Sequence, residues 1–82
     1  MAQVKVLFFA ALAEAAGQRE ALIEVEDGEP VGVLSTKLAD RFPKLSGIVA
    51  NVAFAVNAEY VPAGQPLHDG DEVALIPPVS GG

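Results

Sequence analysis

A single amphipathic helix is the feature that most limits how this chain can fold. Apolar residues recur at helical spacing at Val31, Leu34, Leu38 and Phe42. Polar residues fill the opposite side, namely Ser35, Thr36, Lys37, Asp40 and Arg41. We expect Pro30 to be the first helical residue, Gly32 to weaken the first turn and Pro43 to end the helix. Because the helix has only one apolar stripe, it needs a sheet to cover.

Extended segments before the helix can supply part of that sheet. At the start of the chain, Val4, Val6 and Phe8 alternate with Lys5, Leu7 and Phe9. Both faces of this segment are largely apolar, which indicates a central strand. Residues 21–26 alternate between apolar positions on one face and more polar positions on the other, which predicts a second strand. The alanine-rich stretch 10–16 stops at Gly17 and predicts a short helix between two antiparallel strands.

The second half of the chain predicts three further extended pieces, at residues 52–57, 60–61 and 72–76. Turn signals separate them at residues 62–64 and 69–71. The last piece is largely apolar, so we expect it to be central and parallel to the first strand. The result is one α+β domain over residues 1–82, a ubiquitin-like β-grasp with a mixed sheet, the main helix across one face and an extended tail at 77–82. We expect its core to contain Phe8, Phe9, Phe42 and Phe54.

Composition argues against several classes of function. The chain has no cysteine, which rules out disulfides, thiolate metal sites and a catalytic thiol. Its net charge of −6 argues against binding nucleic acid or an anionic membrane surface. That charge either suits a partner with a basic face or only keeps the protein soluble. No apolar run reaches the length of a membrane span.

Two local patterns are explained without a special function. The start of the chain imitates a short signal peptide. However, Lys5 is the single positively charged side chain before its apolar stretch, and cleavage would remove a strand that the sheet needs. We therefore expect a cytoplasmic protein. His68 is expected on a surface loop, and Asp69, Asp71 and Glu72 are expected to form a solvated turn and not a metal site.

The chain ends in the sequence IPPVSGG. Pro77 and Pro78 favour an extended exit, and Gly81 and Gly82 have no side chains to obstruct a narrow channel. Fully extended, residues 79–82 reach about 13 Å. A carboxylate must be activated, typically with ATP, before it accepts a nucleophile, and a thin chain end can deliver one to such an enzyme. A Gly-Gly ending alone, however, is more often a frayed end than a functional one.

Three stretches together resemble a known family over nearly the whole chain. They are residues 6–14 (VLFFAALAE) with Gly17, residues 56–61 (VNAEYV), and residues 67–73 (LHDGDEV) followed by the IPPVSGG ending. This pattern is similar to the small, sulfur-carrying subunits of molybdopterin synthase. The sister carriers of thiamine synthesis share the fold and the Gly-Gly pair but usually lack the two prolines. Ser80, where alanine is common, and the weak helix start at residues 30–32 depart from the pattern.

The resemblance implies a protein cosubstrate that is not an enzyme on its own. An ATP-dependent enzyme would adenylate Gly82, with Gly81 beside it, and a sulfur donor would convert the terminus to a thiocarboxylate. The tail would then enter the large synthase subunit, expected in a heterotetramer, and give sulfur to cyclic pyranopterin monophosphate. The residues expected to contact the partner are Ile76, Pro77, Pro78, Val79 and Ser80. No bound cofactor or metal is expected.

Other interpretations stay open at this point. The chain could carry sulfur for thiamine synthesis or tRNA thiolation, or it could modify other proteins. In a different class, it could be a ubiquitin-like interaction module with an inert tail. With no cysteine to hold a persulfide, a sulfur carrier of this sequence has only its C-terminus for the sulfur. A docking surface should lie where the tail leaves the domain, so exposed apolar residues near positions 76–79 are its best candidates.

Overall fold

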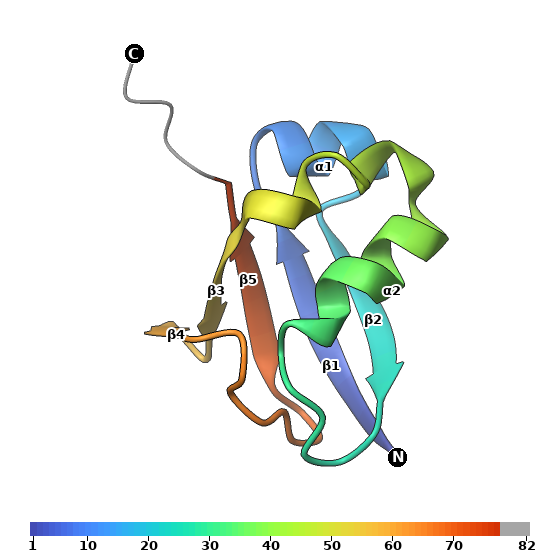
Figure 1. The fold of residues 1–82 in the computed structure, drawn as a ribbon. Helices are drawn as coiled ribbons and strands as arrows, with labels where there is room; N and C mark the ends of the chain where they lie inside the picture. The colour runs from blue at the N-terminus through green and yellow to red at the C-terminus, as the bar shows by residue number, and fades with distance from the viewer. Residues whose placement is uncertain (78–82) are drawn as a thin grey trace.

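The computed structural model describes residues 1–77, and its ribbon is shown in Figure 1. The elements in chain order are β1 (Ala2–Phe8), α1 (Ala11–Ala16), β2 (Glu20–Val25), α2 (Val33–Arg41), the 3₁₀ turns η1 (Pro43–Leu45) and η2 (Val49–Asn51), β3 (Ala53–Val56), β4 (Glu59–Val61) and β5 (Glu72–Ile76). The five strands form one sheet, and α2 lies across one of its faces (Figure 1). The predicted α+β fold with a mixed sheet is confirmed.

The order of strands in the sheet is β2-β1-β5-β3-β4. β1 pairs with β2 in antiparallel fashion and with β5 in parallel fashion, as in the pairing of Val6 with Val73. β5 in turn pairs with β3, which carries the short edge strand β4. The expectation that the first and last strands are central and parallel is therefore confirmed.

The core lies between the sheet and the helices. Alternate residues of β1, including Val4 and Val6, are fully buried on the face that α2 covers, together with Leu34 and Leu38 of the helix. The rings of Phe8 and Phe42 meet edge to face, with their centroids 5.7 Å apart. Phe8 and Phe54 are buried as predicted, and Phe42 packs against the core while partly exposed.

The start of the main helix differs from the prediction. α2 begins at Val33, and Pro30 instead forms an isolated bridge with Pro66. The reason is that the preceding backbone is bonded to a distant loop. Val31 N–H donates to the Gln65 carbonyl at 2.8 Å, and Gly32 N–H donates to the Ala63 carbonyl at 2.9 Å. These bonds hold residues 30–32 against the segment before β5, so the first helical turn starts after them.

Gly32 has a packing role that the sequence did not reveal. A Cβ atom at this position would lie 3.1 Å from both the Cβ and the carbonyl oxygen of Ala63. Glycine therefore lets two backbone segments approach closely. The expectation of a weakened first turn missed this, because the residue lies just before the helix and serves a contact remote in sequence.

Both helices are short. α1 ends at Ala16, and the glycine stop predicted from the sequence is confirmed: Gly17 adopts a left-handed conformation with φ 75° and donates its N–H to the Ala13 carbonyl. α2 has nine residues and ends at Arg41, just before Pro43. Within residues 1–77, no helix is long and apolar enough to cross a membrane.

Candidate functional site

The end of β5 leads into the C-terminal segment of the chain. Ile76 is the last residue of β5 and pairs with Ala53 of β3. Ile76 and Pro77 are both half-buried, so the described chain is still packed against the domain at this point. The other predicted site residues, Pro78, Val79, Ser80, Gly81 and Gly82, lie outside the described residues.

Register places a row of apolar side chains on the sheet face opposite α2. Leu7 pairs with Ala74, Ala74 with Ala55, and Ala55 with Tyr60, and paired residues project from the same face. Ile76 projects from that face two residues after Ala74. We define this surface as the open-face patch, which consists of the exposed Phe9 and Tyr60, the half-buried Leu7, Ala74 and Ile76, and the buried Ala55.

Phe9 is exposed, contrary to the expectation that it belongs to the core. Its side chain is 49% exposed, whereas the preceding Phe8 is 3% exposed. The two-residue period of a strand explains the difference, because the helices of residues 1–77 cover only one face of β1. The chain turns immediately afterwards: Ala10 has φ 50°, and Leu12 N–H donates to the Phe9 carbonyl at 3.0 Å. Phe9 therefore follows the C-terminal end of β1, at the same end of the sheet where the parallel strand β5 also ends.

Tyr60 is the most exposed aromatic side chain in the described chain, at 74%. It belongs to the edge strand β4, whose position on the sheet follows from pairing between segments far apart in sequence. The sequence predicted a short extended piece here but did not mark Tyr60 as a surface residue. A tyrosine in an extended piece is compatible with either face, so only the register could place it.

One asparagine in the β3–β4 turn holds the N-terminal end of β5 in place. Asn57 has φ 51° and donates its backbone N–H to the Glu72 carbonyl at 2.8 Å. Its side-chain oxygen accepts from Glu72 N–H at 3.1 Å, and its Nδ2 donates to Asp71 Oδ1 at 3.0 Å. These bonds fix the register of β3 against β5, and that register aligns Ala55 with Ala74 in the open-face patch.

The acidic turn before β5 has a structural role. Asp69 Oδ1 accepts the backbone N–H of Gln3 at 2.8 Å, and Asp71 Oδ2 accepts that of His68 at 2.8 Å. His68 itself is exposed, as predicted for a surface loop. Among residues 1–77, no three histidine or acidic side chains are arranged so that they could hold a metal ion.

The sheet order, the helix across one face and the parallel first and last strands define a ubiquitin-like β-grasp protein. A ubiquitin from Caldiarchaeum subterraneum shares this fold, with a TM-score of 0.65, 17% identity, and coverage of 99% of this chain and 98% of that one. Sequence is more specific than fold here. The ThiS family matches residues 6–82, and the chain belongs to that family.

Similar proteins share the whole length of the chain. The molybdopterin synthase sulfur carrier subunit of Chlamydomonas reinhardtii is 43% identical over 82 residues, covering 98% of this chain and 99% of its own. The human protein of the same name is 40% identical over 85 residues, and the match covers 100% of this chain and 97% of the human one.

Two solved structures are also informative. The small archaeal modifier protein 1 of Haloferax volcanii has a TM-score of 0.85 at 31% identity and covers 96% of this chain and 100% of its own. The complex of subunits 1 and 2 of the molybdopterin-converting factor from Helicobacter pylori contains a chain with a TM-score of 0.69 at 28% identity, with coverage of 98% and 99%.

Proposed function

We propose that this chain is a sulfur carrier of molybdenum cofactor biosynthesis and acts as the small subunit of a molybdopterin synthase. The full-length similarity to sulfur carrier subunits of that enzyme supports this role. The observation that carries the proposal is structural: the central strand β5 ends at Ile76, directly before the C-terminal segment, beside a surface on which Phe9 and Tyr60 are exposed.

The reactive group in this proposal is the Gly82 carboxylate. A carboxylate oxygen attacks the α-phosphorus of ATP within an activating enzyme, which gives an acyl adenylate and releases pyrophosphate. Sulfide-level sulfur from a donor then attacks the acyl carbon, displaces AMP and leaves a thiocarboxylate. The thiocarboxylate is ionised at neutral pH, so its sulfur can act as a nucleophile on cyclic pyranopterin monophosphate without a base from this chain. Water would then cleave the acyl–sulfur bond, which leaves the sulfur on the pterin and restores the Gly82 carboxylate. The sequence contains no cysteine that could carry the sulfur instead, as a persulfide.

The large subunit would bind two parts of the chain at once. Residues 76–80 and the two glycines would extend into its active site, and the open-face patch would rest against its surface. Phe9 and Tyr60 expose large apolar side chains, a type of residue that commonly anchors protein interfaces. The solved complex of subunits 1 and 2 of a molybdopterin-converting factor supports a large-subunit partner. The activating enzyme would need the same terminus, so the two partners would bind in turn.

Intact mass of the protein from cells tests the proposal directly. A sulfur carrier should show a fraction in which one terminal oxygen is replaced by sulfur. Deleting Gly82, or replacing Gly81 with tryptophan, should abolish sulfur transfer in a reconstituted synthase and leave the thermal melt nearly unchanged. A chain blocked at its terminus as an amide that still sustained sulfuration of the pterin would refute the proposal.

A second candidate is attachment to other proteins. The similarity to a small archaeal modifier protein favours it, because the same activated terminus could acylate a lysine amine. Conjugates that increase the mass of other proteins by this chain, formed with the activating enzyme and ATP, would support that role. Reconstitution with the thiamine, tRNA or pterin sulfur acceptor would separate the carrier pathways, and an inert module would give no thiocarboxylate at all.

A further inference from the structure

The outer edge of the sheet at β2 presents backbone groups that no other strand of residues 1–77 pairs with. Within residues 1–77, β2 pairs with β1 alone, so the other side of the strand faces away from the sheet. Phe8 N–H donates to the Arg19 carbonyl at 2.8 Å, which shows that odd-numbered residues turn their backbone groups toward β1. Glu20, Leu22 and Glu24 therefore turn theirs outward. A row of this kind is ready to pair with the strand of another molecule.

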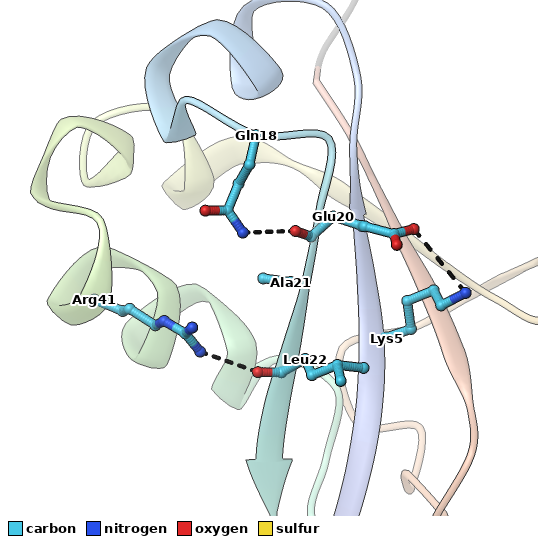
Figure 2. A pocket seen from close by; sticks show the side chains of 6 residues that line it. All are labelled: Lys5, Gln18, Glu20, Ala21, Leu22 and Arg41. Carbon is cyan, nitrogen blue, oxygen red and sulfur yellow. Dashed lines mark hydrogen bonds and ion pairs between the residues drawn. The ribbon is translucent and has the colours of Figure 1, made fainter.

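Two side chains of the same molecule donate hydrogen bonds to two of these three outward carbonyls. Gln18 Nε2 donates to the Glu20 carbonyl at 2.6 Å, and Arg41 Nη1 donates to the Leu22 carbonyl at 3.0 Å (Figure 2). Figure 2 shows both side chains reaching the strand, Gln18 from the segment after α1 and Arg41 from the end of α2. The Arg41 guanidinium also lies 5.5 Å from the centre of the Phe42 ring.

The carboxylates of β2 oppose pairing of two copies. The outward-facing residues carry Glu20 and Glu24 on either side of Leu22, whose side chain is 54% exposed. If two β2 strands paired in antiparallel fashion about Leu22, Glu20 of each copy would face Glu24 of the other. Like charges directly opposite one another destabilise a strand pair.

We propose that Gln18 and Arg41 protect the β2 edge and prevent two copies of this chain from pairing through it, β2 against β2. The attraction for such pairing is the exposed Leu22 and the outward backbone row, and the two side chains occupy two of its three carbonyl acceptors, those of Glu20 and Leu22. The proposal is independent of sulfur chemistry, because β2 is separated by β1 from the strand that leads to the terminus.

The test opens the edge and measures self-association. We would combine Gln18→Ala, Arg41→Ala and Glu24→Gln, all at exposed positions, so that the fold is retained and checked by its thermal melt. In sedimentation, this open variant should move from one-chain to two-chain mass as its concentration rises. Its dimer dissociation constant should be lower than that of the wild type by roughly tenfold or more. Hydrogen exchange at the Leu22 and Glu24 amides should slow in parallel.

Two further variants sharpen the result. Arg41→Met keeps the apolar stem over Phe42 while removing the donors, so in place of Arg41→Ala it should give the same dimer. Lys44→Ala with Glu14→Gln makes the same change of charge at exposed positions away from the edge and should leave the chain monomeric.

Three outcomes would overturn the proposal. The first is a folded open variant that stays monomeric over the same concentrations. The second is a dimer that Tyr60→Ser abolishes while exchange at the Leu22 and Glu24 amides is unchanged, which would assign association to the open-face patch. The third is a wild-type chain that already pairs through its β2 amides.

Discussion

Phe8 lies directly beside Leu75 in the parallel pair formed by β1 and β5. Both side chains are buried on the face that α2 covers, at 3% and 0% exposure. The next residues, Phe9 directly after β1 and Ile76 at the end of β5, belong to the opposite face because successive side chains of an extended chain alternate. One pairing therefore fixes the core on one face and brings an exposed aromatic ring beside the exit of the C-terminal segment on the other.

Leu75→Ala should strongly destabilise the domain. The side chain is fully buried in a central strand, so the substitution removes apolar contacts and leaves a cavity, at a cost of about 2–5 kcal/mol in the free energy of unfolding. Chemical denaturation measures this directly. The matched control is Leu22→Ala, which removes the same atoms from an exposed position and should cost under about 1 kcal/mol. Equal losses in the two variants would contradict the described burial.

Gly32→Ala should destabilise the protein, although alanine is the better helix former. The new Cβ would meet Ala63 at 3.1 Å and force residues 30–32 away from the loop to which they are bonded, at a cost of about 1–3 kcal/mol. Gly47→Ala is the control, because a Cβ added there would meet no atom within 4 Å beyond its chain neighbours, and its thermal melt should change little. A Gly32→Ala variant as stable as the wild type would show that the two segments are not in close contact.

Ala58→Gly should stabilise the domain. Asn57 and Ala58 form the turn between β3 and β4 with φ of 51° and 71°, a conformation that glycine adopts without strain. Relief of this strain outweighs the extra freedom of glycine in the unfolded chain, with a net gain of about 0.5–1 kcal/mol. Ala39→Gly, within α2, should change the midpoint of denaturation in the opposite direction.

Tyr60→Ser and Phe9→Ser should weaken binding to the large synthase subunit. Each removes an exposed apolar side chain of the open-face patch, and together they should raise the dissociation constant by roughly tenfold or more with little change in the thermal melt. Isothermal titration calorimetry with the large subunit is the measurement. Leu22→Ser, an exposed residue on the same face but at the β2 edge, should leave the affinity unchanged. If it weakened binding as much as the other two, the interface would have to extend across the whole sheet.

Much of the fold follows from local patterns in the sequence. The stripe of Leu34 and Leu38, the two-sided apolar strands at both ends of the chain and the stop at Gly17 each depend on neighbouring residues, and each was predicted correctly. The proposed chemistry of the tail rests on the sequence alone, because the absence of cysteine and the Gly-Gly ending are properties of composition and order.

Contacts between distant segments decided the rest. Pro30 and Gly32 satisfied the local rules for a helix start and a weak turn, yet hydrogen bonds to residues 63 and 65 delayed α2 until Val33. The apolar neighbours of Phe9 predicted a core residue, but no helix within the described residues 1–77 covers its face of the sheet. A local pattern gives the period of a segment, whereas burial depends on what packs against each face, and that is set only when the strands pair in register.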